Sequence, residues 1–374
     1  MLSPHRPQCV LVTGGAGYLG SIVVSQLLSR GVHVRILDCL LFGGQSIEKL
    51  RSHANCEFIL GDIRDIGTSV RAMDGCDTVI HLAGIVGDQA CEANRELTVE
   101  VNAAATRMLA EIAPRCGIHR FLFASSCSVY GSSRATVAES SRLHPLSLYA
   151  QTKVDSERVL VDACTRGFAP TVLRLGTLFG VSPRMRFDLV LNLLAARAVS
   201  VGRITVRNGR QWRPFIHVRD AARAFLACID SQAEHVAGEI FNVGSSFLNA
   251  QIRQLGEIVA HLVPGTAVTE IYDRLDQRSY RACFDKIERT LGFVCRETLE
   301  AGVREVSAAV AADDISNASG DRSPIRMSTS TRATTTPIHV LPSPRAAAVR
   351  ATLRRKTGPA VPLGVAASTS KAGD

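Results

Sequence analysis

The chain has 374 residues, of which 46% are hydrophobic and 21% charged, with a formal net charge of +9. This length can hold one large α/β domain or two smaller ones. No run approaches the roughly 20 consecutive apolar residues of a membrane helix, and the polar start of the chain offers no core for a signal peptide. The composition therefore predicts a cytoplasmic globular protein rather than a membrane protein.

The positive charge and the cysteines exclude two further classes. After Val306 the chain carries nine basic and four acidic residues, so this segment holds more than half of the net charge. The remaining body suits an anionic small molecule and gives no reason to expect nucleic acid as a partner. Eleven cysteines are scattered without a cluster at zinc spacing. We expect reduced thiols and no metal site.

Short β-branched runs alternate with longer amphipathic segments in the first half, which is typical of a parallel sheet with crossover helices. We predict strands at Cys9–Thr13, His33–Asp38, Cys56–Leu60, Thr78–Leu82, Arg120–Ser125 and Thr171–Leu175. The intervening helices are expected near Tyr18–Arg30, Arg95–Cys116 and Leu148–Thr165. Right-handed crossovers then give an α/β fold with a doubly wound sheet, whose ligand site lies at the carboxyl ends of the strands.

The second half loses this alternation. A helix at Phe187–Ala198, a strand at Phe215–Val218 and a helix at Asp220–Ile229 precede a strand at Ile240–Val243 that returns to the sheet. We therefore expect residues 178–306 to form mainly a smaller substrate-binding lobe. Residues 307–374 are rich in Ala, Ser, Thr, Pro and Arg without periodicity, which predicts a disordered basic tail.

The strongest local signal is Thr13-Gly-Gly-Ala-Gly-Tyr-Leu-Gly20, a glycine-rich turn between a strand and a helix. Glycines there let backbone N–H groups approach a pyrophosphate at the helix N-terminus. An acid, Asp38, ends the next strand, where it would accept hydrogen bonds from ribose hydroxyls and repel a 2′-phosphate. The pattern predicts a Rossmann-like NAD-binding domain over residues 1–177, with NAD favoured over NADP. The turn residues expected to bind NAD are Gly14, Gly17, Tyr18, Leu19 and Gly20.

Two later strand ends are expected to border the same cofactor. Asp62 and Ile63, after the third strand, are placed to bracket the adenine, although this segment is as consistent with an ordinary strand-to-turn cap. The small residues of Leu82-Ala-Gly84, after the fourth strand, allow the chain to pass close to the cofactor phosphates. From this segment we include Leu82, Ala83 and Gly84.

The candidate catalytic residues are Ser126, Tyr149 and Lys153. Tyr149 and Lys153 lie four apart on a predicted helix and so project from the same face. An ammonium beside a phenol favours the phenolate, which predicts that Lys153 lowers the pKa of Tyr149 towards neutrality. Tyr149 would then act as general base and acid, while Ser126 hydrogen-bonds the same substrate oxygen. An isolated tyrosine–lysine spacing occurs on many surface helices, but here it follows a dinucleotide-binding pattern.

These motifs together resemble the extended short-chain dehydrogenase/reductase family, the NAD-dependent epimerase/dehydratases. The resemblance runs from about Cys9 to Val306 and rests on the ordered segments Thr13–Gly20, Gly61–Asp65, His81–Gly84, Ser125–Gly131, Tyr149–Lys153, Arg213–Asp220 and Phe241–Gly244. It implies that Ser126, Tyr149 and Lys153 form a catalytic triad, and that Tyr149 and Lys153 also contact the cofactor. It further implies a homodimer formed through the helices at Arg95–Cys116 and Leu148–Thr165.

The resemblance also bears on the reaction and on the substrate. Dehydratases of this family place an Asp-Glu pair after the catalytic hydroxyl residue, whereas this chain has Cys127 and Ser128. Dehydration is therefore not expected. Thr177 stands where many relatives have a substrate-contacting Asn, and we include it in the substrate site. Four further residues match positions that contact the nucleotide diphosphate and ribose of sugar nucleotides: Asn192, Arg213, Asp276 and Arg278.

Three hypotheses follow. The first is a sugar-nucleotide epimerase acting at C4 through a transient keto intermediate. The second is a ketoreductase or dehydrogenase of a sugar nucleotide or a related hydroxylated substrate, which would exchange free NAD(P)H. The third is a non-catalytic dinucleotide-sensing protein, which the presence of Tyr149 and Lys153 disfavours. Arg213 and Arg278 have their own alternative, as solvated surface charges.

Overall fold

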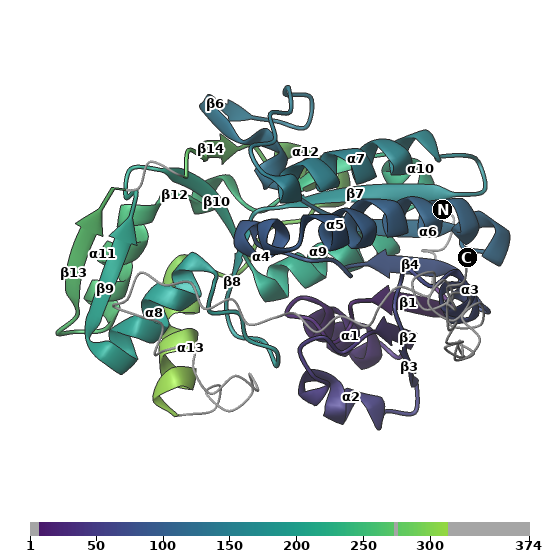
Figure 1. Ribbon diagram of the computed structural model, residues 1–374, viewed down its shortest axis with the longest axis horizontal. Helices are drawn as coiled ribbons and strands as arrows, with labels where there is room; N and C mark the ends of the chain where they lie inside the picture. Colours follow the sequence, from purple (N-terminus) through teal and green to yellow (C-terminus); the bar gives the residue numbers. More distant parts are fainter. Residues whose placement is uncertain (1–6, 273–275, 313–374) are drawn as a thin grey trace, which may run out of the picture. The chain divides into compact units, whose positions relative to one another are not determined.

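The computed structural model describes residues 7–272 and 276–312. Its centre is a seven-stranded sheet in the order β11-β7-β5-β4-β1-β2-β3, in which every neighbouring pair is parallel (Figure 1). The strands are β1 (Cys9–Thr13), β2 (His33–Asp38), β3 (Cys56–Leu60), β4 (Thr78–His81), β5 (Arg120–Ser126), β7 (Ala169–Leu175) and β11 (Ile240–Val243). This confirms the predicted doubly wound α/β fold. The sequence placed three strand ends wrongly, because β4 stops at His81, β5 includes Ser126 and β7 begins at Ala169.

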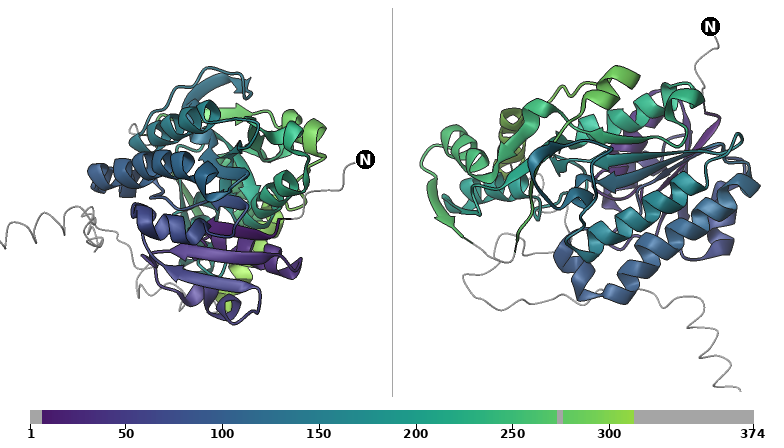
Figure 2. Two further views of the ribbon diagram at one scale, coloured as in Figure 1. Left: turned by 90° about the vertical axis from the view of Figure 1, so that its right-hand side faces the viewer. Right: turned by 90° about the horizontal axis from the view of Figure 1, so that it is seen from above.

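Helices cover both faces of the sheet (Figure 2). On β1, Val10 and Val12 belong to one buried core and Leu11 to the other, as the two-residue period of a strand requires. One core includes residues of α1 (Gly20–Ser29) and α9 (Val218–Asp230). The other includes residues of α3 (Ile66–Met73), α6 (Ala105–Ile112) and α7 (Leu148–Asp162). All seven residues of β7 are buried, because this central strand is covered on both sides.

The predicted helices are present, with corrected ends. The segment Arg95–Cys116 is divided into α5 (Arg95–Val99), a π-helical turn (Glu100–Ala104), α6 and a 3₁₀ turn (Ala113–Cys116). Helix α7 ends at Asp162 rather than Thr165, because Thr165 pairs with Phe168 across a tight turn. Helix α1 begins at Gly20 rather than Tyr18, since the preceding residues form the glycine-rich turn. Short helices α2 (Glu48–Arg51), α4 (Asp88–Ala93) and α10 (Ala233–Val236) and a 3₁₀ turn (Gln45–Ile47) complete this half.

The second half contains the predicted helix at Phe187–Ala198 as α8 and the predicted strand at Phe215–Val218 as β10, together with elements that the sequence prediction did not include. Three small sheets pair β12-β10-β8, β13 with β9, and β14 with β6. Their strands are β6 (Ser132–Val137), β8 (Thr177–Phe179), β9 (Arg203–Arg207), β10 (Trp212–His217), β12 (Asn249–Gln251), β13 (Ala267–Ile271) and β14 (Ser279–Ala282). The helices are α8 (Val190–Val201), α11 (Ile252–Leu262), α12 (Asp285–Leu291) and α13 (Leu299–Ala311), with 3₁₀ turns at Cys127–Tyr130 and Ser246–Leu248.

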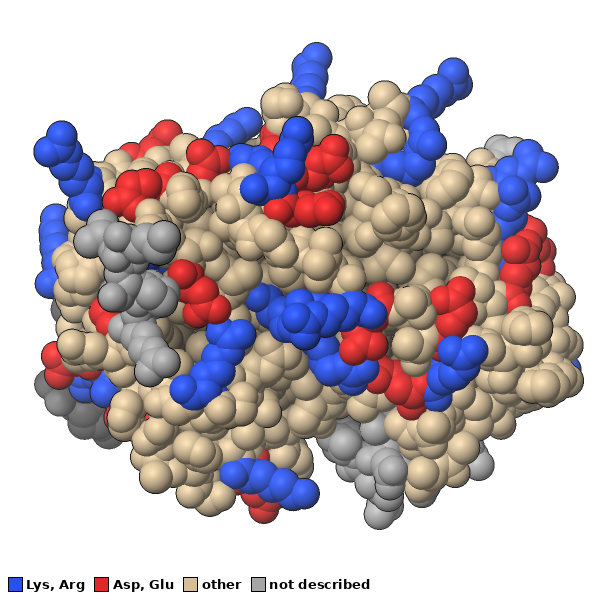
Figure 3. Space-filling model, turned by 180° about the vertical axis from the view of Figure 1, so that it is seen from behind, with Lys and Arg blue, Asp and Glu red and all other residues tan. Residues whose placement is uncertain are grey.

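Helix α13 corrects the expected start of the tail. It continues five residues past Val306, because Val303 and Val306 are fully buried and the Ala-rich residues after them favour a helix. The rest of the predicted tail, residues 313–374, lies outside the described residues. Within the described residues, no helix is both long and apolar enough to cross a bilayer. On the face shown in Figure 3, basic and acidic side chains are interspersed.

Candidate active site

The glycine-rich turn lies between β1 and α1 and is packed against the segment that follows β4. Gly14 has φ +73, and a Cβ there would lie 2.6 Å from the backbone nitrogen of Ala83. A Cβ on Gly20 would overlap the carbonyl oxygen of Gly14 and lie 2.8 Å from the Cα of Gly15. No side chain caps the N-terminus of α1. Its backbone N–H groups are therefore suited to an anion such as a pyrophosphate.

Asp38 lies at the carboxyl end of β2, beside this turn. Its two carboxylate oxygens accept hydrogen bonds from Ala16 N at 2.9 Å and Leu40 N at 2.8 Å. Burial raises the pKa of Asp38, and the two backbone donors oppose that rise. Each oxygen retains a lone pair for a further donor. Asp38 can thus hold the turn in place and still accept a ribose hydroxyl.

The other predicted cofactor residues differ in their burial and in their contacts with other protein groups. The carboxylate of Asp62 forms an ion pair with the guanidinium of Arg64 at 2.6 Å, so part of its role is structural. Ile63 is buried. Leu82, Ala83 and Gly84 continue from β4, where Leu82 N donates to Thr13 O at 3.1 Å. A Cβ on Gly84 would lie 3.1 Å from the side-chain oxygen of Asn102.

Asn102 and His81 support this segment and were missed by the sequence reasoning. The amide of Asn102 accepts from Ile85 N and donates to Ile85 O, both at 2.8 Å. His81 bonds Thr13 Oγ1 at 2.7 Å and Thr106 Oγ1 at 3.0 Å. Burial lowers the pKa of His81 to about 3, and the charge of Lys153 contributes. The only sequence feature that could have indicated the role of Asn102 was a polar residue within an otherwise amphipathic helical segment.

The three predicted catalytic residues are brought together at the carboxyl end of the sheet. Ser126 ends β5, and Tyr149 lies in the first turn of α7, whose N-terminus is capped by Ser147. The side chains of Ser126 and Tyr149 lie close enough to interact. One turn further along α7, Lys153 Nζ donates to Ala124 O at 2.8 Å and lies 5.7 Å from the centre of the Tyr149 ring. A substrate oxygen that meets Tyr149 would therefore also meet Ser126.

The protonation of this group differs from the sequence prediction. Burial raises the pKa of Tyr149 to about 12, while Arg186 and the side chain of Ser126 act to lower it. Burial also lowers the pKa of Lys153 to about 8. The prediction that Lys153 brings the pKa of Tyr149 towards neutrality is wrong, because desolvation of the phenolate outweighs the favourable charges.

A buried ion pair fixes α7 against the sheet directly behind these residues. Arg174 on β7 forms a two-pronged pair with Glu157, at 3.0 Å from Nε to Oε1 and 2.7 Å from Nη2 to Oε2. Both side chains are 3% exposed. Ser125 Oγ also donates to Glu157, and Tyr130 OH accepts from Arg174 at 2.9 Å. This network sets the position of α7, and hence of Tyr149 and Lys153, relative to Ser126.

Asn192 has a different place from the one predicted for it. It is fully buried, and its amide bonds Gly180 N at 2.9 Å, Tyr18 OH at 3.2 Å and Arg186 O at 3.0 Å. Tyr18 OH in turn donates to Gly180 O at 2.6 Å. We therefore revise the expectation that Asn192 contacts substrate, because all of its polar atoms bond protein groups. Asn192 and Tyr18 instead attach the loop after β8 to the glycine-rich turn.

The remaining predicted substrate residues form a charged cluster at the edge of the second lobe. Arg278 bonds Asp276 through Nε at 2.9 Å and Nη2 at 3.0 Å. Arg213, on β10, reaches Asp276 at 3.2 Å. Arg278 also pairs with Asp88, at the start of α4, which the sequence reasoning did not assign to the site. Thr177 begins β8, the neighbour of β10. Neither arginine is an isolated surface charge.

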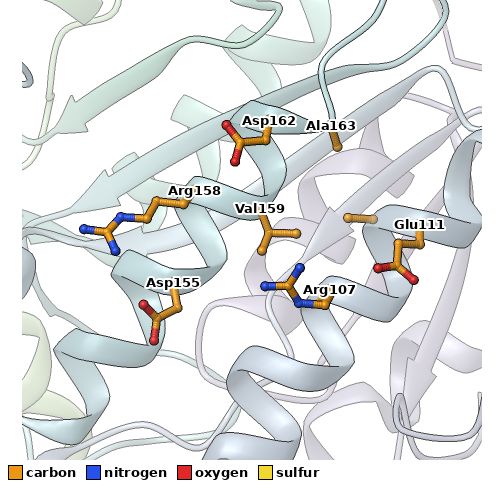
Figure 4. Close-up of a pocket in the computed structure, with 8 residues that line it drawn as sticks. Arg107, Glu111, Asp155, Arg158, Val159, Asp162 and Ala163 are labelled. Carbon is orange, nitrogen blue, oxygen red and sulfur yellow. The ribbon is translucent and has the colours of Figure 1, made fainter.

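A separate depression of about 450 Å³ lies away from these residues, between α6 and α7 (Figure 4). Its lining combines basic and acidic side chains, including Arg107, Glu111, Arg158 and Asp162, around the smaller Val159 and Ala163. Tyr149 and Lys153 are not part of this lining. The helix face that would dimerise by resemblance is thus charged and carries both signs.

Comparisons with known proteins agree with this geometry. A dTDP-glucose 4,6-dehydratase from Actinoplanes sp. is 30% identical over 315 residues, which cover 80% of this chain and 96% of the relative. A UDP-glucose 4-epimerase from Neisseria meningitidis serogroup C is 29% identical over 304 residues, 74% of this chain and 88% of that protein.

A solved structure of UDP-glucuronic acid 4-epimerase from Bacillus cereus, in complex with UDP-glucuronic acid and NAD, has a TM-score of 0.73. It is 25% identical and covers 81% of this chain and 98% of that chain. The family model of the NAD dependent epimerase/dehydratase family matches residues 10–244. The chain belongs to the NAD-dependent epimerase/dehydratase family.

Proposed function

We propose that this protein is an NAD-dependent sugar-nucleotide epimerase that acts at C4 of the hexose. The observation that carries the proposal is the convergence of Ser126, Tyr149 and Lys153 at the strand ends next to the glycine-rich turn. The relatives named as a UDP-glucose and a UDP-glucuronic acid 4-epimerase support the substrate class. The homologous dehydratase supports the sugar-nucleotide class but not the same reaction.

The residues present fit NAD. Gly14 and Gly20 allow a backbone packing that a Cβ would prevent, the N-terminus of α1 has no side-chain cap, and Asp38 would accept ribose hydroxyls. Gly17, Leu19 and the segment Leu82–Gly84 line the same turn, and Ile63 borders the adenine end. NAD supplies a hydride acceptor that returns the hydride in the second half of the reaction. Residues 1–177 with β11 would form the cofactor-binding part of the protein.

Tyr149 performs the proton transfer in this proposal. Its phenolate accepts the proton of the C4 hydroxyl while that carbon is oxidised to a ketone, and it returns the proton when the ketone is reduced from the opposite face. Ser126 donates a hydrogen bond to the same oxygen in both half-reactions. The positive charge of Arg186 favours the phenolate against the effect of burial, and Lys153 Nζ lies 5.7 Å from the centre of the Tyr149 ring.

The residues after Ser126 argue against dehydration. Cys127 is buried and its thiol donates to Arg174 O at 3.2 Å, while burial raises the pKa of the thiol above its ordinary value. The hydroxyl of Ser128 is buried next to it. Neither side chain is a carboxylate, so neither can carry the proton transfers at C5 and C6 that dehydration needs.

We further propose that the protein forms a homodimer through α6 and α7. The depression between these helices carries charges of both signs, so the same face of a second copy, turned by a twofold axis, would be complementary to it. Light scattering of the purified protein should give twice the mass of the chain. A monomer at assay concentration would refute this assembly.

The reaction is tested with a panel of UDP- and dTDP-hexoses, without added cofactor, by following C4 epimers by proton NMR. We expect the native protein to interconvert the C4 epimers of at least one sugar nucleotide, and we expect the Tyr149→Phe variant to lack this activity. If no sugar nucleotide is interconverted while the purified protein contains NAD, the epimerase proposal is wrong. Turnover only with added NADH and a keto sugar nucleotide would identify a ketoreductase instead.

A further inference from the structure

A carboxylate with no role in the proposed chemistry lies at the start of α4. Asp88 follows Gly87, whose φ of +91 turns the chain from the segment after β4 into this short helix. One carboxylate oxygen, Oδ2, accepts a hydrogen bond from Arg278. The other, Oδ1, is buried and has no hydrogen-bond partner among the described residues. A buried unpaired acceptor is destabilising and marks a group that requires an explanation.

Asp88 interacts both with the predicted catalytic tyrosine and with the two predicted substrate-binding arginines. Burial is the largest cause of the raised pKa of Tyr149, and the negative charge of Asp88 contributes in the same direction. Asp88 also interacts electrostatically with Arg213. Asp88 is therefore close enough to act on the phenol that would meet the hexose hydroxyl, and it contacts one of the arginines expected to meet the diphosphate.

Both arginines are paired with acidic side chains of the protein. Arg278 gives Nε and Nη2 to Asp276, at 2.9 and 3.0 Å, and Nη1 to Asp88. A diphosphate that takes a two-pronged hold of a guanidinium needs two of these N–H groups in the same plane. One N–H donor remains on Nη1 and one on Nη2, so a diphosphate held by this pair would lie beside both carboxylates, and repulsion between like charges favours replacing one carboxylate with the phosphate. Asp88 accepts a hydrogen bond from one nitrogen of Arg278, whereas Asp276 accepts from two, so the contact with Asp88 is the easier one to exchange.

We propose that Asp88 is a sugar-recognition residue that pairs with Arg278 and is released when Arg278 binds the nucleotide diphosphate. The freed carboxylate then accepts hydrogen bonds from hydroxyl groups of the hexose, which also satisfy Oδ1. The inference rests on the proposed function, because it takes a sugar nucleotide as the ligand. It assigns to Asp88 the discrimination between a hydroxylated sugar and a bare diphosphate.

The exchange gives opposite effects on two ligands. Asp88 competes with the diphosphate for Arg278, so removing its charge should strengthen the binding of UDP, which has no sugar. A partly exposed ion pair of this kind corresponds to about a two- to fivefold change. The same substitution removes a charged acceptor from the hexose and should lower kcat/KM for a UDP-hexose by about tenfold or more.

The experiment compares Asp88→Asn, Asp88→Ala and the control Glu92→Gln, an exposed acid on the same helix whose partner is Arg95. Titration calorimetry with UDP measures binding independently of turnover, and an NMR assay of the active UDP-hexose measures kcat/KM. Far-UV circular dichroism checks that each variant is folded. Both measurements are repeated for Asp88→Asn in an Arg278→Gln background, where no guanidinium remains to be released.

The expected result is tighter UDP binding and slower UDP-hexose turnover in both Asp88 variants, native behaviour in Glu92→Gln, and no gain of UDP affinity in the Arg278→Gln background. Unchanged or weaker UDP binding in a folded Asp88 variant would overturn the exchange at Arg278, and unchanged turnover would overturn the sugar contact. If the native protein binds neither UDP or dTDP nor any UDP- or dTDP-hexose, the proposed function fails, and this inference fails with it. An active native enzyme with indifferent Asp88 variants refutes this inference alone.

Discussion

The buried pair of Glu157 and Arg174 gives a sharp test of how the catalytic helix is held. Arg174→Met removes the guanidinium and keeps an apolar side chain of similar length in a site that is 3% exposed. It leaves Glu157 buried without its charged partner, and Tyr130 OH loses the donor at 2.9 Å. Breaking a buried pair from one side costs about 3–5 kcal/mol. We expect a loss of that size in the free energy of unfolding.

The measurement is urea denaturation followed by far-UV circular dichroism, with the slope compared between variants so that a midpoint shift can be interpreted as stability. Arg304→Met, an exposed arginine on α13, is the matched control and should change stability by less than about 0.5 kcal/mol. The double variant Glu157→Leu/Arg174→Met should be no less stable than Arg174→Met, because it buries no unpaired charge. A single variant within about 1 kcal/mol of the native protein would refute the reasoning.

Three further predictions concern the site itself. Burial depresses the pKa of Lys153 to about 8, so the folded protein carries a destabilising ammonium below pH 8. Lys153→Met should therefore be about 1–3 kcal/mol more stable than the native protein at pH 7, and this gain should shrink as the pH rises from 8 towards 10.5. An equal stability difference at pH 7 and at pH 10.5 would contradict the prediction. Gly20→Ala should lower the NAD content of the purified protein, since its Cβ would overlap the backbone of the turn, whereas Gly167→Ala, in open space, should not. Tyr149→Phe should retain NAD and lose at least about 100-fold in kcat, because it removes the proton donor and keeps the ring; near-native turnover would exclude Tyr149 as the base.

The sequence predicted the features that depend on neighbours along the chain. The glycine-rich turn, the seven sheet strands and the placement of Tyr149 and Lys153 on one helix follow from local patterns of period two and period 3.6. The pair of Asp88 and Arg278 joins residues 190 positions apart, and no local pattern marks either as a partner of the other.

Burial explains the other differences. The pKa of Tyr149 was predicted in the wrong direction because the sequence shows the nearby lysine but not the desolvation of the ring. Asn192 matched a substrate-contacting position, yet its surroundings occupy every polar atom of its amide. The last turn of α13 was assigned to the tail on composition alone, although two buried valines attach it to the lobe.

The central claim is that one bound NAD serves many turnovers without net change. The most direct measurement uses purified enzyme at low concentration, no added cofactor and an excess of a UDP-hexose, with the C4 epimer and the NADH absorbance followed in the same sample. Our account predicts many product molecules per enzyme-bound NAD and no accumulation of NADH. Product that stops at one equivalent per enzyme, or that appears together with equimolar NADH, would contradict it.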